Sequence, residues 1–287
     1  MGLSAVILTY NTPVELIQTC LNSILLHNDI KDDLQVILVD NNSENKSEVA
    51  NFLTTHYPEV EFISNSKNAG YGAGNNLGIQ QAKHDYIILI NPDVEIIEPI
   101  FGWAVDRFNS DINLKLLGIQ QVNQYNQKTH SFILRKLTRK CFVQNFILNK
   151  VNHFSAKYAV ISGACFFLRK ASFLEIGGYD ENIFLYGEER YLHEHILAKF
   201  SNAKIEIDFS KKYKHPISDR KFSIQNEEYG LNSYFYLKQK LGEQKSEIYR
   251  EVVNYYKTLI AFYTIKKKAQ VAKNYNLVLD LLAKKFK

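Results

Sequence analysis

The sequence predicts an α/β fold with a mostly parallel central sheet, followed by a helical C-terminal extension. In the first hundred residues, short runs of branched apolar residues alternate with segments of helical spacing. Asn and Asp residues gather directly after each apolar run. Beyond residue 220 the spacing is helical and the composition is rich in Lys, Tyr and Leu.

Each element follows from a local pattern. The runs Leu3–Leu8, Val36–Val39, Val60–Ile63 and Tyr86–Ile90 are short enough for buried strands, and segments 13–26, 43–55 and 71–82 are expected to be helices. We expect Thr12 to cap the first helix, with Pro13 at its first position, and Ser43 to open the second. Strands and helices in this alternation form a parallel sheet with right-handed crossovers.

Composition excludes several classes. The chain has 287 residues, of which 46% are hydrophobic and 23% charged, so it is not intrinsically disordered. Its apolar runs are shorter than the ~18 residues that a membrane span needs. The N-terminus lacks the basic lead of a signal peptide. The three cysteines Cys20, Cys141 and Cys165 form no C-x-x-C pair, so we expect neither disulfides nor a zinc cluster, and a cytoplasmic location.

The net charge of +5 hides an uneven distribution. Residues 1–111 carry a net charge of −10, residues 112–174 carry +10 with no acid, 175–210 carry −5, and 211–287 carry +10. Blocks this uneven suggest an anionic partner, such as an acidic lipid surface, a diphosphate or a nucleic acid. A solvated Lys-rich surface is the alternative. Because no nucleic-acid-binding motif is present, we do not expect nucleic acid as a partner.

The polar clusters point to one ligand site. They are Thr9-Tyr10-Asn11, Asp40-Asn41-Asn42, the loop Asn65–Asn76, and Asn91-Pro92-Asp93. All four follow the carboxyl ends of predicted strands, which share one edge in a parallel sheet where ligands bind. Asn and Asp are also common in turns. Four such turns at one edge nevertheless favour a shared site.

The motifs also limit the ligand. The glycines at 70, 72 and 74 do not match G-x-G-x-x-G, and no P-loop is present, so a dinucleotide dehydrogenase and a P-loop NTPase lose support. Asp93, at a strand end, has the chemistry to bridge Mg²⁺ or Mn²⁺ to a diphosphate. The plainer interpretation of Asn91-Pro92-Asp93 is a turn that opens a helix near Glu95.

Taken together, these motifs resemble family 2 glycosyltransferases with the GT-A fold, a Rossmann-like nucleotide-diphospho-sugar transferase fold, and most of all the rhamnosyltransferase-like branch. The resemblance extends over roughly residues 3–220. The matching segments are Val6–Asn11, Val39–Ser43, Asn68–Asn76, Leu89–Asp93, Ser162–Ala164, Gly177–Glu181 and Phe184–Glu189.

The resemblance implies substrate contacts. Residues 9–11 would line the base pocket, Asp40 would hydrogen-bond the base or ribose, and residues 68–76 would lie near the ribose and donor sugar. The substrate-binding residues implied in this way are Thr9, Tyr10, Asn11, Asp40, Asn42, Asn68, Gly70, Asn75, Asn91, Asp93, Gly163 and Ala164.

The resemblance also implies the catalytic groups. Asn91 stands where the family has the first acid of its Asp-x-Asp motif, so Asp93 would be the main ligand of Mg²⁺ or Mn²⁺, helped by His215. Glu188-Glu189 stands where the family has Glu-Asp, so Glu189 would be the base that activates the acceptor hydroxyl. Their like charges are expected to raise each other's pKa. Without the resemblance, both acids would be read as complements of a helix dipole.

The expected organisation has two parts. Residues 1–220 would form the catalytic domain, with a nucleotide-sugar-binding half at 1–111 and an acceptor half at 112–220. Residues 221–287 would form a helical basic extension with helices at Glu227–Leu241 and Glu247–Lys268. Together with Arg135–Lys140, the tail is a candidate for peripheral contact with the cytoplasmic face of the inner membrane. The alternative is a helical tail packed on the catalytic domain.

The expected activity is inverting transfer of a sugar from a dTDP- or UDP-linked donor to a glycan or lipid-linked glycan in bacterial surface polysaccharide synthesis. On resemblance, dTDP-rhamnose is the first candidate donor and a UDP-sugar carrying galactose, N-acetylglucosamine or glucose is the second. A sugar nucleotidyltransferase is disfavoured, because it should carry a Gly-rich, Arg-bearing turn after the first strand. A non-catalytic sugar-nucleotide-binding protein remains the alternative.

Overall fold

The computed structural model describes residues 2–216 and 222–287, whose contacts divide into two units. The first unit contains residues 2–132, 161–184 and 188–216, and the second contains 133–160, 185–187 and 222–287. The boundary expected at 220/221 lies outside the described residues. Residues 133–160, expected in the catalytic domain, group with the C-terminal helices.

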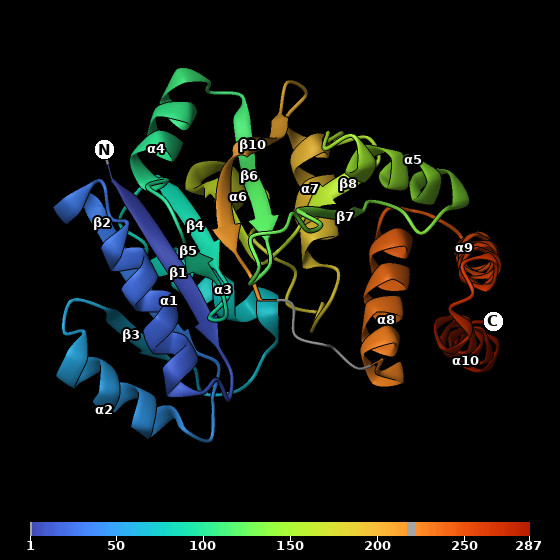
Figure 1. Ribbon diagram of the computed structural model, residues 1–287, viewed down its shortest axis with the longest axis horizontal. Coiled ribbons are helices and arrows are strands. Elements are labelled where there is room, and N and C mark those ends of the chain that lie inside the picture. The colour runs from blue at the N-terminus through green and yellow to red at the C-terminus, as the bar shows by residue number, and fades with distance from the viewer. Residues whose placement is uncertain (1, 217–221) are drawn as a thin grey trace. The chain divides into compact units, whose positions relative to one another are not determined.

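The described part of the first unit is built on an eight-stranded sheet (Figure 1). Its strands, in spatial order, are β3 (Glu61–Ser64), β2 (Leu34–Asp40), β1 (Leu3–Thr9), β4 (Tyr86–Ile90), β9 (Cys165–Arg169), β6 (Leu114–Val122), β10 (Lys204–Lys214) and β5 (Glu95–Ile96). The first four strands are parallel, as are β6 and β10. Strand β9 is antiparallel to β4 and β6, and β5 is antiparallel to β10. The prediction of an α/β fold with a mostly parallel sheet is confirmed.

Helices cover both faces of this sheet, which explains why β1, β2 and β4 are buried along nearly their whole length. The helices of the first unit are α1 (Val14–Leu26), α2 (Lys46–His56), α3 (Tyr71–Gln81), α4 (Phe101–Ser110), α6 (Lys170–Glu175) and α7 (Glu188–Lys199). Ile17 of α1, Leu53 of α2 and Phe101 of α4 join one buried core with alternate strand residues such as Ile7. Helix α3 packs on the other face, where Gly78 approaches the side chain of Val6.

Two predictions about helix starts are wrong, as is the alternative interpretation that a helix opens near Glu95. Helix α1 begins at Val14 with Pro13 as its N-cap, and no side chain, Thr12 included, caps it. Helix α2 begins at Lys46, because the Ser43 hydroxyl instead accepts the backbone N–H of Asn11. The segment at Glu95 forms the short strand β5, not a helix, since it pairs with the end of β10.

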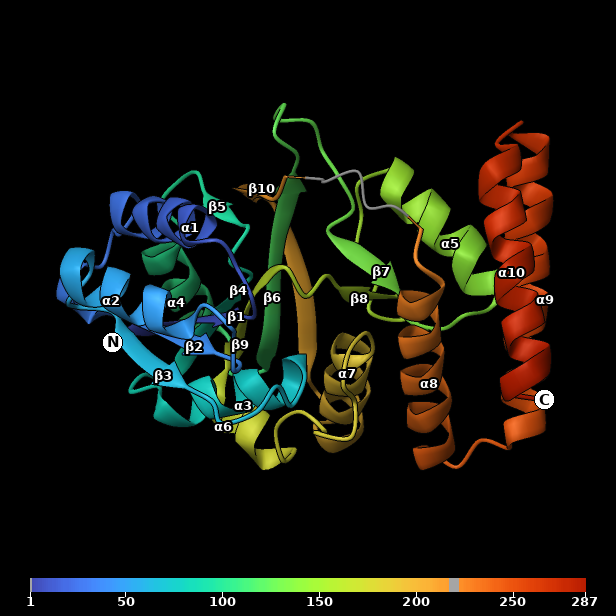
Figure 2. The ribbon, with the colours of Figure 1, turned by 90° about the horizontal axis from the view of Figure 1, so that it is seen from below.

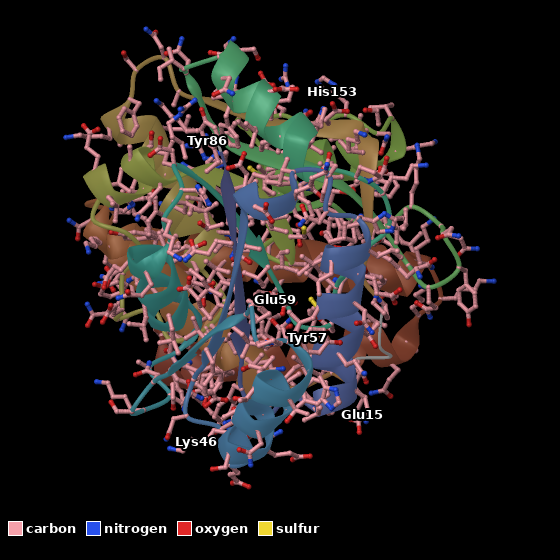
Figure 3. The ribbon with its side chains drawn as sticks, turned by 90° about the vertical axis from the view of Figure 1, so that its left-hand side faces the viewer. Glu15, Lys46, Tyr57, Glu59, Tyr86 and His153 are labelled. Atoms are coloured by element: carbon pink, nitrogen blue, oxygen red, sulfur yellow. The ribbon has the colours of Figure 1, made fainter. Side chains whose placement is uncertain are left out.

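Helices α1 and α2 are joined by a side-chain hydrogen bond. Tyr57, labelled in Figure 3, directly follows α2 and is buried. Its hydroxyl donates to the Asn22 side chain of α1 at 2.6 Å. Burial raises the pKa of this hydroxyl, so it remains a donor over the physiological range.

The second unit is mainly helical. Its helices are α5 (Arg139–Lys150), α8 (Ile224–Lys240), α9 (Lys245–Ile265) and α10 (Ala269–Lys285), and the short strands β7 (Phe132–Leu134) and β8 (Ala159–Ile161) pair where the chain passes between the units. Helices α9 and α10 lie side by side in Figures 1 and 2. No helix among the described residues is long and apolar enough to cross a membrane.

The C-terminal tail packs inside its own unit. Val278, Leu282 and Phe286, from α10 and the residue after it, join a buried cluster with residues of α8 and α9, such as Leu231 and Ile248. The buried side of α10 is therefore packed against helices of its own unit, while Leu277 of the same helix is 46% exposed.

Two glycine substitutions test this packing in opposite directions. A Cβ atom on Gly78 would lie 2.5 Å from Val6 Cγ1 and 2.9 Å from Val39 Cγ2, both in buried strands. Gly78→Ala should therefore lower the free energy of unfolding by about 1–3 kcal/mol. Urea denaturation of the purified protein measures the change.

Gly230→Ala is the matched control. A Cβ atom on Gly230, within α8, would meet only Tyr186 Cβ at an ordinary 3.7 Å. Alanine in a helix is favoured over glycine by about 0.8–1 kcal/mol, so this variant should be unchanged or more stable. Equal destabilisation by the two substitutions would contradict the packing of α3 on β1 and β2.

Candidate functional site

The carboxyl ends of β1 and β2 lie at one level, because these strands pair in parallel with Thr9 opposite Asp40. Asp40 is fully buried, and its Oδ1 atom accepts the backbone N–H of Ser43 at 2.9 Å. Its Oδ2 atom is buried without a hydrogen-bond partner among the described residues. A buried acceptor without a donor is costly, so this oxygen is suited to a donor group on a ligand.

The loop after β1 is joined to the loop after β2. Asn11 adopts a left-handed backbone conformation, with φ of 49°, as does Asn42, with φ of 65°. The N–H of Asn11 donates to the Ser43 hydroxyl, and its side-chain oxygen accepts the N–H of Glu44, both at 2.8 Å. The Tyr10 side chain is 51% exposed. Asn11 therefore shapes this edge, while Tyr10 is open to a ligand.

Asn41 joins three segments at the same edge, although sequence reasoning passed it over. Its side-chain amide donates to Asn68 Oδ1 at 2.9 Å and to the Gly70 carbonyl at 3.1 Å. Its side-chain oxygen accepts from Asn65 at 3.0 Å. Asn41 is buried, so it fixes the glycine-rich loop rather than facing solvent. The only sequence signal was its place between two polar neighbours.

The glycine-rich loop contacts two distant segments of the first unit. Gly70 has φ of 93°, and a Cβ atom there would overlap the Phe184 carbonyl, so the position requires glycine. The next residue, Tyr71, donates its N–H to the same carbonyl at 3.0 Å. Its hydroxyl donates to the Gly163 carbonyl at 2.9 Å. Tyr71 thus joins the start of α3 to the segment before β9.

The two asparagines of α3 have structural contacts. Asn75, expected to bind substrate, is buried, and its amide donates to the Tyr71 carbonyl at 3.0 Å. Asn76 accepts the N–H of Tyr179 and donates to its carbonyl, both at 2.9 Å, and also contacts Glu181. Sequence reasoning gave Asn76 no separate role. Asparagine is a weak helix former, so two within a helix were the available signal.

The segment Gly163-Ala164 lies against the end of β4. Strands β4 and β9 pair antiparallel with Ile90 opposite Cys165. The N–H of Asn91 then donates to the Ala164 carbonyl at 2.8 Å. Residues before β9 therefore meet the residues that follow β4, although more than seventy positions separate them in the chain.

Asp93 and His215 form a pair at this edge. His215 Nε2 lies 3.2 Å from Asp93 Oδ2, and the His215 N–H donates to the Val122 carbonyl at 2.9 Å. Nδ1 of His215 is buried without a hydrogen-bond partner among the described residues. The structure thus brings together two residues expected to bind metal that are 122 positions apart.

These two side chains fit a hexacoordinate divalent cation. Two neighbouring ligand atoms on such a cation, each about 2.1 Å from it, lie about 3 Å apart, close to the 3.2 Å observed between the His215 and Asp93 atoms. The described residues contain no group of three or more His, Cys, Asp or Glu able to hold a metal ion. A metal held here would therefore take its other ligands from substrate phosphates and water, as Mg²⁺ commonly does.

Glu188 and Glu189 occupy the first turn of α7. Glu188 is buried and Glu189 is half-buried. The Glu189 carboxylate lies against the Cα atom of Gly163, so close that a Cβ atom there would overlap Oε1. The backbone N–H of Gly163 also donates to this carboxylate. Glycine at 163 therefore permits Glu189 to reach the segment that contacts Asn91.

Burial raises the pKa of the Glu189 carboxyl group above its ordinary value. Backbone N–H groups of Glu189 and Gly163 and the charge of Arg190 oppose this shift by stabilising the carboxylate. Burial is thus the main cause, rather than the repulsion between neighbouring acids expected from the sequence. The result is a carboxylate with increased proton affinity.

A continuous series of contacts joins the predicted site residues. Asn41 binds Gly70, Tyr71 binds Gly163, Gly163 contacts Glu189, and Ala164 binds Asn91. Asp40, Asp93 and Glu189 therefore belong to one connected edge of the first unit. The Asp40 acceptor oxygen, the Asp93–His215 pair and the half-buried Glu189 carboxylate at one edge suit transfer of a group between phosphate and hydroxyl oxygens.

Known proteins resemble this chain in sequence and in fold. The family model "Glycosyl transferase family 2" matches residues 4–177, more than half of the chain. A poly(ribitol-phosphate) beta-glucosyltransferase of Bacillus spizizenii is 35% identical over 125 residues, or 42% of this chain. The match covers 20% of that relative, so the chain spans about a fifth of its length.

Solved structures share the fold. S. aureus TarS 1–349 in complex with UDP has a TM-score of 0.58 and 15% identity, covering 89% of this chain and 70% of that one. The mannosyltransferase PcManGT from Pyrobaculum calidifontis, in complex with GDP-Man and Mn²⁺, has a TM-score of 0.57 and 12% identity, covering 98% and 74%. At these identities the likeness concerns the fold alone.

Substitution of Asn41 tests the connection between β2 and the glycine-rich loop. Asn41→Ala removes the partners of Asn68, Gly70 and Asn65. Buried polar groups left unpaired should lower the free energy of unfolding by about 2–3 kcal/mol. Urea denaturation measures this change.

Asn51→Ala, on the exposed side of α2, is the matched control and should alter stability by less than about 0.5 kcal/mol. If Asn41→Ala proves as mild as the control, the hydrogen bonds of Asn41 do not hold the loop in solution.

Proposed function

Because the chain belongs to glycosyl transferase family 2, we propose that this enzyme transfers a sugar from a nucleotide-diphosphate donor to a hydroxyl group with inversion at the anomeric carbon. The acceptor in this proposal is a glycan or lipid-linked glycan of bacterial surface polysaccharide. Inversion follows when the acceptor oxygen attacks the anomeric carbon from the side opposite the leaving diphosphate, in a single displacement.

One observation carries the proposal. The two-residue segment Gly163-Ala164 contacts Glu189 through Gly163 and contacts Asn91 through Ala164. Asn91 in turn lies two residues before Asp93, the partner of His215. The proposed base Glu189 and the Asp93–His215 pair, proposed to act on the diphosphate, therefore lie on the two sides of one short segment. A displacement reaction requires this separation between the group that activates the acceptor and the group that binds the leaving phosphate.

The donor base binds at Asp40 in this proposal. The free Oδ2 atom of Asp40 would accept the imide N–H of uracil or thymine, which both bases carry. The UDP bound to TarS and the glucosyltransferase activity named for the Bacillus spizizenii relative favour a UDP-sugar over dTDP-rhamnose. Thermal shift with a panel of nucleotide sugars and Mn²⁺ ranks the two donors.

Glu189 is the proposed base. Its raised pKa gives the carboxylate more affinity for the proton that the acceptor hydroxyl loses. Gly163 fixes the carboxylate by hydrogen bonding, and Tyr71 fixes Gly163 through its carbonyl. The base is thus held by the backbone, and its own side-chain freedom is restricted.

Asp93 and His215 are the proposed ligands of Mn²⁺ or Mg²⁺. When bound, such a cation supplies positive charge that stabilises the departing diphosphate by several kcal/mol. The protein's own contribution is to hold the two ligand atoms at a fixed spacing, through the His215 N–H bond to Val122 and the turn that follows β4.

A lipid-linked acceptor would bring the enzyme to a membrane surface. We include peripheral association with the cytoplasmic face of the inner membrane in the proposal, because the second unit is rich in Lys and Arg. The tail predicted to provide it packs many of its apolar residues inside the unit. It leaves Ile265 and Leu277 exposed for such contact.

Glu189→Gln tests the base. The substitution keeps the shape of the side chain but removes the proton acceptor, so kcat should fall about 10²–10⁴-fold. Donor binding, measured by titration calorimetry with UDP and Mn²⁺, should be retained. Burial disfavours the charged carboxylate, so the neutral variant should be at least as stable as the wild type near pH 7.

Wild-type kcat should fall on acidification at a pH above the ordinary Glu pKa of about 4.3, since protonated Glu189 cannot act as a base. Glu175→Gln, at an exposed acid of α6, is the control and should leave activity unchanged. Full turnover by Glu189→Gln, with loss in Glu188→Gln, would transfer the role to Glu188. Turnover by neither wild type nor variants would favour a non-catalytic binding protein.

Asp93→Asn tests the cation ligands. The affinity for UDP should rise with Mn²⁺ in the wild type, and this rise should shrink at least tenfold in the variant, because an amide is a poorer cation ligand than a carboxylate. His215→Gln should have a similar but smaller effect. Glu98→Gln, at an acid paired with Lys211, is the control. Equal Mn²⁺ dependence in Asp93→Asn and wild type would exclude Asp93 as a ligand.

A further inference from the structure

The surface of residues 136–157 has an unusual composition. Ten of its side chains are exposed, and every one is either basic or apolar. They are Lys136, Arg139, Lys140, Val143, Phe146, Ile147, Lys150, Val151, His153 and Lys157. A helix that faces only water ordinarily exposes acids, amides and hydroxyls. This surface instead combines positive charge with large apolar groups.

Helix α5 at the centre of this surface already has a buried side. Cys141 and Leu148 are buried, and the Phe142 ring packs edge-on against Tyr255 of α9. One turn after Phe142, Phe146 is still 51% exposed, and Ile147 is 47% exposed. Large apolar side chains of α5 therefore remain exposed although the helix is packed against α9.

The end of α9 extends the same surface. Phe262 contacts the rings of Phe142 and Phe146, with centroids 5.4 and 6.0 Å away. Three residues later Ile265 is 81% exposed, and Lys266–Lys268 follow it directly. Figure 2 shows α5 beside the α9–α10 pair. Phe262 thus joins α5 to the end of α9, where an exposed isoleucine and three exposed lysines follow.

We propose that this surface, here called the α5 face, rests on an anionic lipid bilayer. The α5 face consists of Val143, Phe146, Ile147, Val151 and Ile265 with the basic residues around them. Its apolar groups enter the boundary between headgroups and acyl chains, and its Lys and Arg side chains contact lipid phosphates. The absence of acids from residues 112–174 removes the repulsion that an anionic surface would otherwise meet.

The combination of basic and apolar side chains on the α5 face favours an anionic bilayer over other partners. An anionic polymer alone would be bound by the basic side chains and would leave Phe146 and Ile147 in water. A second copy of the chain would bring two basic surfaces together, which like-charge repulsion disfavours. A bilayer with anionic headgroups satisfies both the charge and the apolar area. This inference deepens the membrane part of the proposed function and is independent of the donor and of the base.

Vesicle co-sedimentation of the full-length protein tests the proposal. Wild-type protein should bind vesicles of phosphatidylcholine with 30% phosphatidylglycerol at least tenfold more tightly than pure phosphatidylcholine, and salt should weaken this binding. The variant F146D/I147D should bind the anionic vesicles at least tenfold more weakly. The control I112D/L174D changes two exposed apolar residues of the first unit and should bind as the wild type does.

Every variant is also assayed for thermal unfolding and for affinity toward UDP with Mn²⁺, which should remain unchanged. Wild-type protein that binds no anionic vesicles, or F146D/I147D that binds them normally, would overturn the proposal. The proposal would also be overturned if the wild-type protein were a dimer that F146D/I147D converts to a monomer. It would equally be overturned if an anionic polymer bound F146D/I147D and the wild type alike while vesicles bound neither. If the wild-type protein does not bind UDP, that result would instead count against the proposed function and not against the α5 face.

Discussion

The antiparallel insertion of β9 beside β4 is the constraint on which the candidate site depends. Pairing of Ile90 with Cys165 puts the amino end of β9 at the carboxyl end of β4. Gly163 and Ala164 therefore reach the edge to which the parallel strands bring Asp40 and Asp93. A parallel β9 of five residues would place its amino end about 17 Å away, at the opposite edge of the sheet. The reversal of one strand is what lets Glu189 contact the segment that also meets Asn91.

Two glycines allow the segments at this edge to come into contact. Gly163 lacks the Cβ atom that would displace the Glu189 carboxylate, and Gly70 adopts a backbone conformation that brings the loop onto the Phe184 carbonyl. Tyr71 donates its N–H to the Phe184 carbonyl and its hydroxyl to the Gly163 carbonyl. The site is thus held by backbone atoms together with buried side chains such as that of Asn41. Such groups move less than long exposed side chains, which favours a fixed geometry at the site.

The sequence predicted the strands and the shared edge, because apolar periodicity and the direction of parallel strands are local properties. It could not predict Asn41 or Asn76 as organising residues, since their partners lie up to 105 positions away. The helix caps were wrong for a related reason: Ser43 satisfies the Asn11 backbone instead of its own helix. The pairing of Asp93 with His215 was reached through resemblance, because no spacing rule joins residues 122 positions apart.

Glu189 illustrates how such a site balances reactivity against stability. Burial raises the carboxyl pKa, so above that raised value the folded protein holds a charge that would be better solvated in the unfolded chain. The cost vanishes as the pH falls below the ordinary Glu pKa, because the group is then protonated in both states. Hydrogen bonding from the Gly163 N–H limits the cost without removing the proton affinity. The residue that leaves room for the Glu189 carboxylate therefore also opposes part of the rise in its pKa, which burial causes.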